Sequence, residues 1–330
     1  SPPMLSNSLF RPIREELPAA TIIAVTKDCT FFNSFLLQVN YNTFRQKKQY
    51  VKKNYFPLLL FVEKKGIIFK NIPSGRKNMK IICLGDVVGE VGLDAVKKGL
   101  PSLIKEYDAD FVVVNGENAN KYNGISADDA KELRYCGADV ITTGNHVFRQ
   151  RSVYSLLDEA EYIIRPANYP SSAPGTGYTE IKTPFGAVAV INLMGQVNVD
   201  EVDNPFATVD ALLKKIDAEY IIVDMHAEAT SEKRAMGFYL DGKVSVVFGT
   251  HTHVQTADEQ FLPKGTAYIT DLGMCGAHDS VLGIKKECVI EKFRTRMPAV
   301  FEKATENVIL DGLFVDTDNK MIERIGAKIQ

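Results

Sequence analysis

The sequence has no apolar run long enough to cross a membrane and no closely spaced pair of cysteines. In its N-terminal third the longest apolar stretch is residues 56–62, interrupted by Pro57, whereas a membrane-spanning helix needs about 20 apolar residues. Five cysteines occur in 330 residues without a CxxC pair, which argues against a disulfide framework and favours a reducing compartment. We therefore expect a cytoplasmic protein that does not enter a membrane.

Charge is nearly balanced over the whole chain but not along it. The chain carries 39 Lys and Arg and 41 Asp and Glu, and 45% of its residues are hydrophobic, as in ordinary globular proteins. Residues 1–78 hold 13 Lys and Arg, only 4 Asp and Glu, two glycines and no histidine. Because this basic segment lacks helical or strand periodicity, we expect a poorly ordered N-terminal extension. Residues 79–330 would form the main folded domain, whose net acidic charge disfavours nucleic acid as a partner.

From residue 79 onward, short apolar runs alternate with helical stretches, which is typical of a layered α/β domain. Runs at residues 79–84, 110–114 and 139–142 follow one another at βαβ spacing and predict three parallel strands. Ser126 with Asp129 predicts the start of a helix before the third run, and Gly137 predicts its end. Further candidate strands lie at residues 187–193, 220–225, 244–248, 267–270 and 308–315. This number exceeds the strands of an average sheet, so we expect two facing sheets.

Polar residues and glycines follow five of these predicted strands directly. Because the carboxyl ends of parallel strands form one edge of an open α/β sheet, such residues converge in a single crevice. The converging set contains one Asp, one Glu, two Asn and four of the five histidines, namely Asp86, Glu117, Asn118, Asn145, His146, His226, His251 and His253. Imidazole, carboxylate and amide groups without thiolate suit zinc, manganese or iron rather than a structural zinc site. So many ligands exceed the needs of one tetrahedral ion, which favours two ions sharing a carboxylate, with Glu117 as the candidate bridge.

Each of these residues also has an ordinary interpretation. Asp86 after a strand is more often a helix cap or turn former than a ligand. The glycines within residues 85–92 do not have GxGxxG spacing, and Asp86 would repel a pyrophosphate, so a dinucleotide site is disfavoured. His251 and His253 are a stronger signal, because alternate residues of an extended segment project the same way. His278 lies past a possible strand end but has no companion, and we interpret it as a loop histidine.

The motifs together resemble one known family. From Met79 to the C-terminus the chain resembles the YmdB-like branch of the calcineurin-like metallophosphoesterases. The matching segments are GDVVG at 85–89, NGENA at 115–119, GNH at 144–146, RPAN at 165–168, DMHAEATSEK at 224–233, GTHTHVQTAD at 249–258 and GTAYITD at 265–271. The set is specific in its order and spacing, although no single motif is. Residues 1–78 have no counterpart in the family pattern.

The resemblance implies an α/β fold of the four-layer αββα sandwich type, with two facing mixed sheets and helices outside. It implies that a two-metal centre is held by Asp86, Glu117, Asn118, Asn145, His226, His251 and His253. It also implies that His146 is the catalytic proton donor and that the metal is iron, with manganese as the alternative. This branch lacks the histidine that most other metallophosphoesterases have two residues after the aspartate. Val88 stands at that position here, so one ion would have fewer nitrogen ligands.

Members of this family are similar to phosphodiesterases of 2′,3′- or 3′,5′-cyclic nucleotides, so the sequence favours a metal-dependent hydrolase of cyclic nucleotides. In this hypothesis two cations lower the pKa of a bound water, the resulting hydroxide attacks phosphorus in line, and His146 protonates the departing sugar oxygen. A phosphomonoesterase or protein phosphatase with the same centre is one alternative. A non-catalytic protein that senses a nucleotide or RNA is another. A homo-oligomer is compatible with the sequence.

Overall fold

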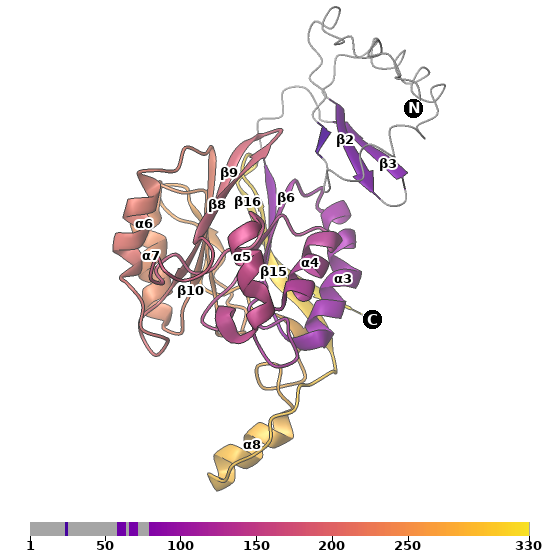
Figure 1. Cartoon of the computed structure of the whole chain (residues 1–330), viewed down its shortest axis with the longest axis vertical. Coiled ribbons are helices and arrows are strands. Elements are labelled where there is room, and N and C mark those ends of the chain that lie inside the picture. Colours follow the sequence, from indigo (N-terminus) through magenta and orange to yellow (C-terminus); the bar gives the residue numbers. More distant parts are fainter. Residues whose placement is uncertain (1–23, 26–57, 64–65, 72–78, 330) are drawn as a thin grey trace, which may run out of the picture. The chain divides into compact units, whose positions relative to one another are not determined.

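The chain divides into two units, Ser1–Lys77 and Asn78–Gln330. The computed structural model describes residues 24–25, 58–63, 66–71 and 79–329 (Figure 1). In the first unit, β1 (Ala24–Val25), β2 (Leu58–Glu63) and β3 (Gly66–Asn71) form a three-stranded sheet that the sequence analysis did not predict. The expected poor order of residues 1–78 concerns mainly residues outside the described ranges and stays a prediction.

The second unit contains two mixed sheets, of which the first has seven strands. These are β4 (Lys80–Leu84), β5 (Asp86–Val87), β6 (Phe111–Asn115), β7 (Val140–Thr142), β14 (Met274–Ala277), β15 (Val308–Asp316) and β16 (Met321–Lys328). Their order is β5-β14-β15-β4-β6-β7, with β16 paired to β15. As predicted, β4, β6 and β7 run parallel, whereas β15 runs antiparallel to β4.

The second sheet has six strands in the order β12-β13-β11-β10-β9-β8. These are β8 (Tyr178–Thr183), β9 (Gly186–Met194), β10 (Tyr220–His226), β11 (Val246–Thr250), β12 (Gln260–Phe261) and β13 (Ala267–Ile269). The four central strands are parallel, and β8 and β12 are antiparallel edge strands. The predicted α/β fold with two mixed sheets is therefore confirmed, and all eight predicted strands form within two residues of their expected ends.

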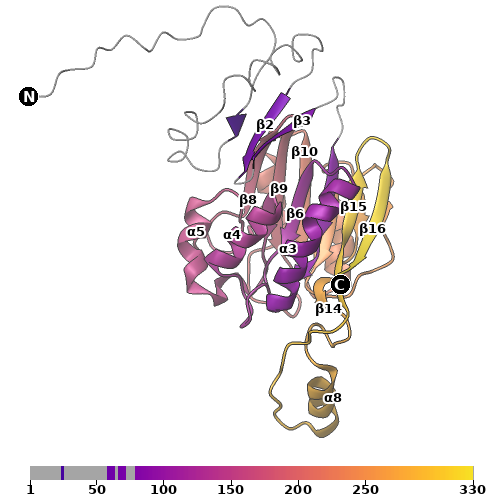
Figure 2. The same cartoon turned by 90° about the vertical axis from the view of Figure 1, so that its right-hand side faces the viewer.

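Helices lie beside both sheets (Figures 1 and 2). The helices beside the sheets are α3 (Gly89–Glu106), α4 (Ala127–Cys136), α5 (Tyr154–Glu159), α6 (Pro205–Leu213) and α7 (Thr230–Leu240), whereas α8 (Lys286–Thr295) projects away from them. The first two contact the seven-stranded sheet, and α6 and α7 contact the six-stranded sheet. The predicted capping box of α4 forms between Ser126 and Asp129, and Gly137 ends the helix with a φ of +124°. None of the described helices is both long enough and apolar enough to cross a membrane.

Successive residues of the central strands belong to different apolar clusters. In β4, Ile82 and Leu84 join a cluster with residues of α3, α4 and α5. Ile81 and Cys83 point to the other face and join a cluster that includes Val190 of the second sheet. A third cluster joins the second sheet to α6 and α7. This alternation is that of strands whose two faces are both buried.

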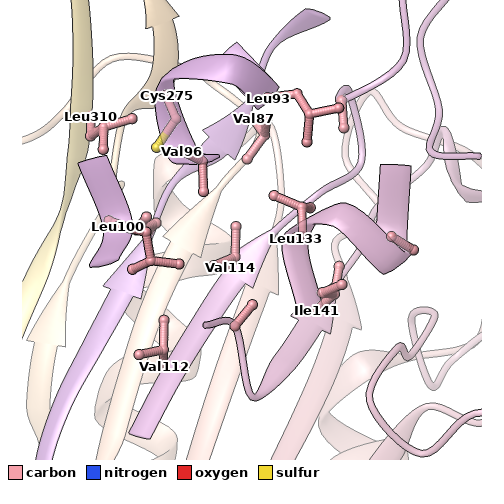
Figure 3. Close-up of a cluster of buried hydrophobic side chains, with 14 of the residues drawn as sticks. Val87, Leu93, Val96, Leu100, Val112, Val114, Leu133, Ile141, Cys275 and Leu310 are labelled. Carbon is pink, nitrogen blue, oxygen red and sulfur yellow. The ribbon is translucent and has the colours of Figure 1, made fainter. Parts of the chain in front are cut away.

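The first cluster fixes α3 on the seven-stranded sheet. Figure 3 shows Leu93, Val96 and Leu100 of α3 together with Val112 and Val114 of β6. Each side chain of this size contributes about 1.5–3 kcal/mol when it is fully buried. The strands of this sheet are thus held rigidly, and the loops that follow them start from fixed positions.

Candidate metal centre

The predicted site residues all lie at or just after the ends of strands. They are Asp86 in β5, Glu117 and Asn118 after β6, Asn145 and His146 after β7, His226 at the end of β10, and His251 and His253 after β11. The first three of these places belong to the seven-stranded sheet and the last two to the six-stranded sheet. Each of the eight residues lies within hydrogen-bond or ion-pair distance of at least one other. The structure therefore brings the whole predicted set together where the ends of the two sheets meet.

Glu117 occupies the middle of this set. Its side chain is 1% exposed, and Oε2 lies 3.1 Å from His226 Nε2. Its other oxygen, Oε1, accepts a hydrogen bond from Asn118 Nδ2 at 2.8 Å and lies 3.5 Å from His146 Nδ1. Burial opposes ionisation, but the neighbouring His226 and His146 outweigh it and hold the pKa of Glu117 well below its usual range. Glu117 is thus a buried, charged carboxylate.

Glu117 also belongs to two separate groups of potential metal ligands. Ligand atoms of Glu117, His226 and His251 lie within 4.8 Å of one another, and so do those of Asp86, Glu117 and His253. A carboxylate that is common to two ligand groups is what a pair of cations a few ångströms apart requires. The described residues therefore offer a potential two-metal centre, in which the individual ligand roles stay predictions.

The chemistry of the atoms around His226 fits a cation better than a set of hydrogen bonds. Glu117 Oε2, Asn145 Oδ1 and His251 Nδ1 each lie 3.1 Å from His226 Nε2. One ring nitrogen carries at most one proton, so it cannot donate to all three neighbours. Several electron-pair donors that converge on one small region are typical of a metal site.

Asp86 supplies a second observation that fits a cation. Its carboxylate is 0% exposed, and Oδ2 accepts a hydrogen bond from the backbone N–H of His251 at 3.1 Å. Oδ1 has no hydrogen-bond partner among the described residues and lies 3.9 Å from His253 Nε2. Burial raises the pKa of Asp86 well above its usual range. A buried carboxylate oxygen without a partner is costly unless a positive ion approaches it.

The close approach of these groups depends on Gly144. A Cβ atom at this position would overlap both Glu117 Oε2 and His226 Nε2. Any other residue would therefore push the loop after β7 away from the centre. The glycine of the GNH motif is required by space and not by backbone conformation, because its φ is not positive.

A buried hydroxyl and a buried carboxylate fix the orientation of His226, and the sequence analysis missed both. His226 Nδ1 lies 2.9 Å from Thr250 Oγ1, and this hydroxyl donates to Asp224 Oδ1 at 2.7 Å. Asp224 also accepts from Thr142 Oγ1 and Asn115 Nδ2. Because the hydroxyl proton of Thr250 goes to the Asp224 carboxylate, the Thr250 oxygen accepts a hydrogen bond from Nδ1–H of His226. The other ring nitrogen of His226, Nε2, then faces the centre with its electron pair. Asp224 stands two residues before His226 in an apolar strand, so the two side chains share one face. This spacing was the signal that could have revealed the carboxylate beside His226.

The loop that carries His251 and His253 is not extended, so the expectation of two parallel side chains in an extended segment is wrong. Both residues have positive φ values, of 95° and 62°. A non-glycine residue in this region costs on the order of 1–3 kcal/mol and persists only where its surroundings hold it. Between them, Thr252 Oγ1 donates to Asp271 Oδ2 at 2.6 Å, and Lys233 Nζ lies 2.6 Å from the same oxygen. This buried ion pair, which the sequence analysis did not single out, anchors the loop.

The two neighbouring histidines differ in their preference for a proton. Burial opposes the charged form of His226, but Glu117 and Asp86 outweigh it and raise the pKa of His226 to about 9. Burial and the adjacent His226 lower the pKa of His251 to about 3. His251 Nε2 lies 3.2 Å from Glu228 Oε2, which leaves Nδ1 directed toward the centre. The centre therefore favours positive charge beside Glu117, either a proton on Nε2 of His226 or a cation that would take its place, while His251 stays neutral.

His278 lies outside this set, and our interpretation that it has no companion is wrong. It follows β14, and its Nε2 lies 3.1 Å from Asp311 Oδ2 in β15. This contact joins two neighbouring antiparallel strands. Asp311 was not recognised because it is more than 30 residues away in the sequence.

A cavity of about 570 Å³ opens beside the centre, a size typical of sites for small molecules. On its lining, the residues of the centre are Glu117, Asn118, His146, His251 and His253. The other lining residues are Lys121, Tyr122, Asn123, Glu228, Thr252, Leu282, Ile284, Phe301 and Lys303. The candidate ligands thus share one space with cationic, aromatic and aliphatic groups.

Comparison with known proteins gives one family. The family model described as YmdB-like protein matches residues 82–327. A 2′,3′-cyclic-nucleotide 2′-phosphodiesterase of Bacillus subtilis (strain 168) is 44% identical over 254 residues, which are 75% of this chain and 96% of that protein. Among solved structures, a hypothetical protein from Thermus thermophilus has a TM-score of 0.72 and 38% identity, and covers 76% of this chain and 100% of its own. A structure described as a novel phosphatase from Mycoplasma pneumoniae has a TM-score of 0.70 and 36% identity over 76% of this chain and 93% of its own.

Proposed function

The chain belongs to the YmdB-like protein family, and from this premise we propose that it is a metal-dependent phosphoesterase that hydrolyses cyclic nucleotides. One observation carries the proposal: Glu117 is shared by two groups of potential metal ligands, and this pair of groups borders a cavity of about 570 Å³. The activity named for the B. subtilis relative supports a 2′,3′-cyclic nucleotide as the substrate.

In the proposed centre, Asp86, Glu117 and His253 would hold one cation, and Glu117, His226 and His251 would hold the other. Asn145, whose Oδ1 lies 3.1 Å from His226 Nε2, would add an amide oxygen. Asn118 is the remaining proposed ligand, through the same Oδ1 that lies 2.8 Å from His146 Nδ1. We propose iron as the metal, with manganese as the alternative. When bound, two such cations supply Lewis acidity to a phosphoryl group and a nucleophilic water near neutral pH.

His146 is the proposed proton donor to the departing sugar oxygen. It lines the cavity, and its Nδ1 lies 2.8 Å from Asn118 Oδ1. The amide of Asn118 donates to Glu117, so its oxygen is the atom that faces His146 and accepts from Nδ1–H. Nε2 is then the ring nitrogen that exchanges a proton with the substrate. A positioned acid of this kind contributes about 10²–10⁴-fold to the rate.

Two further parts of the proposal concern architecture and location. We propose that the layers follow the order helices, sheet, sheet, helices, which the three apolar clusters support. The described cysteines, Cys83, Cys136, Cys275 and Cys288, are free thiols. The cytoplasmic location that the cysteine pattern favours stays a prediction.

The test combines elemental analysis of the purified chain with hydrolysis of three substrates: a 2′,3′-cyclic nucleotide, a linear phosphodiester and a phosphopeptide. We expect two metal ions per chain and fastest hydrolysis of the cyclic nucleotide. Glu117→Gln should lose metal from both positions and lose activity. Glu232→Gln is the control, because the Glu232 carboxylate accepts from the backbone N–H groups of Gln196 and Val197 and contacts no proposed ligand.

The possible results separate the proposal from its alternatives. A chain that carries two metals and cleaves the phosphopeptide but not the cyclic nucleotide would be a phosphatase. A fully metal-loaded chain that is inert toward all three substrates would contradict an enzymatic role and support a sensing protein. Retention of both metals by Glu117→Gln would contradict the assignment of the shared ligand.

A further inference from the structure

The cavity beside the proposed centre contains a lysine without an acidic partner. Lys303 is half-buried on the cavity lining, and its Nζ donates to Asn123 Oδ1 at 2.9 Å. It forms no ion pair with a carboxylate among the described residues. Burial alone lowers the pKa of Lys303, and no neighbouring charge compensates for it. An ammonium group that is partly desolvated and hydrogen-bonded only to a neutral amide can still donate charge-assisted hydrogen bonds, so it favours an anion as a further partner.

Contacts along its whole length fix Lys303 in place. Its backbone forms an antiparallel bridge with Ile284, and the N–H of the next residue donates to the carbonyl of Gly283 at 2.9 Å. The stem of the side chain passes over Gly89, where an added Cβ would lie 3.7 Å from Cγ and Cδ. Asn123, which receives the ammonium, is itself held because its carbonyl accepts from Gln150 Nε2 at 2.9 Å. Segments from distant parts of the sequence thus hold the Lys303 side chain in place at the cavity lining.

Aromatic side chains accompany this cation on the cavity lining. Tyr122 is 76% exposed and immediately precedes Asn123, and Phe301 is 46% exposed and lies two residues before Lys303. Stacking of a nucleobase on an aromatic ring contributes about 1–3 kcal/mol. The cavity therefore offers separate groups for the two chemically distinct parts of a nucleotide, the anionic phosphate and the flat base.

We infer that Lys303, positioned by Asn123, binds a phosphate oxygen of the nucleotide and is a specificity-determining residue of the site. This inference rests on the proposed function, since it places a nucleotide in the cavity. The ammonium group supplies a charge-assisted hydrogen bond to an anion and nothing comparable to an uncharged nucleoside. Lys303 therefore distinguishes a phosphorylated ligand from its unphosphorylated counterpart.

The test measures binding of adenosine 3′-monophosphate and of adenosine to the manganese-loaded full chain by calorimetry. Lys303→Met keeps the apolar stem over Gly89 and removes the charge. We expect it to weaken binding of the monophosphate by at least about tenfold and to leave adenosine binding within about twofold. KM for the cyclic nucleotide should rise by a similar factor, with a smaller change in kcat. Lys303→Arg, which retains the charge, should restore much of the monophosphate affinity.

Lys285→Met is the matched control. Lys285 follows Ile284, the residue bridged to Lys303, but its Nζ lies 2.6 Å from Glu302 Oε2 and it is not part of the cavity lining. It should bind both ligands as the unaltered chain does. Thermal unfolding of each variant shows whether the fold is retained.

Each outcome bears on the inference and on the proposed function separately. Unchanged monophosphate affinity in Lys303→Met refutes the inference even if the chain hydrolyses cyclic nucleotides. An equal loss of adenosine affinity also refutes it, because the role would then be structural. A chain that binds the monophosphate through Lys303 but hydrolyses no cyclic nucleotide upholds the inference and contradicts the proposed function. A chain that binds neither ligand refutes the inference, and the hydrolysis assay alone then decides the proposed function.

Discussion

Replacing Lys233 by methionine should lower the free energy of unfolding of the second unit by about 3–5 kcal/mol. Lys233 and Asp271 are 1% and 0% exposed, and Nζ lies 2.6 Å from Oδ2. Without the ammonium group, Asp271 keeps a buried negative charge that the hydroxyl of Thr252 and the N–H of Gly273 compensate only in part. The magnitude is therefore that of an uncompensated buried charge and not that of a lost surface contact.

Arg234→Met is the matched control for this variant. Arg234 is the next residue of α7 and also pairs with an aspartate, since Nη1 lies 3.3 Å from Asp258 Oδ2. These two side chains are 35% and 31% exposed, and the guanidinium lies 5.2 Å from the centroid of the Tyr268 ring. The guanidinium also lies 5.0 Å from the centroid of the Phe238 ring. A partly exposed ion pair together with two cation–π contacts of this kind contributes about 1–2 kcal/mol. The two neighbouring substitutions should therefore differ by roughly 2 kcal/mol or more.

Urea unfolding of the full chain, followed by far-ultraviolet circular dichroism, measures this difference. The double variant Lys233→Met/Asp271→Asn should recover more than half of the loss, because it no longer buries an unpaired charge. Manganese affinity should fall by about 10–100-fold in Lys233→Met, since Thr252 lies between two proposed ligands. If Lys233→Met costs less than about 1 kcal/mol, or if the double variant is no more stable than the single one, the buried ion pair does not hold the loop.

Three further predictions concern hydrogen-bonded groups in and beside the site. Thr250→Val should weaken manganese binding by about 10–100-fold, whereas Thr142→Val, which removes another hydroxyl from the same buried carboxylate, should change it much less; titration calorimetry decides. His146→Ala should keep both metals but lose about 10²–10⁴-fold in turnover of a cyclic nucleotide, with a smaller loss on a nitrophenyl ester, and equal losses would contradict the proton-donor role. Because Asp311 raises the pKa of His278, this pair stabilises the fold fully below about pH 6.5 and loses its effect as the pH rises through the folded-state pKa. Urea midpoints of His278→Gln should therefore fall below those of the unaltered chain more at about pH 6 than at about pH 9, and a difference independent of pH would contradict this.

The positions of the proposed ligands could be predicted because their signals are local in the sequence. Asp86, Glu117 and His226 each follow or end a short apolar run, and such runs give strands whichever partner they pair with. The rule that parallel strands gather their carboxyl ends at one edge then brings together the residues of each sheet, while the meeting of the two sheet ends lies outside that rule. No knowledge of the exact pairing of strands was needed for this step.

Apart from Asp224, whose place in an apolar strand was a signal, the groups around the ligands could not be predicted, because their roles depend on register and packing. Thr250 contacts His226 because the two are direct partners in the β10–β11 pair, and a shift of one residue would turn Thr250 to the other face. Lys233 reaches Asp271 only because α7 packs on the second sheet. Lys303 lies about 180 residues from Asn123, which holds it. Contacts of this kind leave no periodic pattern in the sequence.

The polar contacts behind the centre also join the two sheets to each other. Asp224 of β10, in the six-stranded sheet, accepts hydrogen bonds from Asn115 of β6 and Thr142 of β7, which belong to the seven-stranded sheet. Thr143, after β7, donates its N–H to Asn192 of β9 at 3.1 Å. Apolar contacts between the sheets are not directional and would tolerate small sliding movements, whereas these hydrogen bonds fix one position. Ligands from both sheets therefore meet with a defined geometry because the residues behind them, and not the apolar interface alone, set how the sheet ends are aligned.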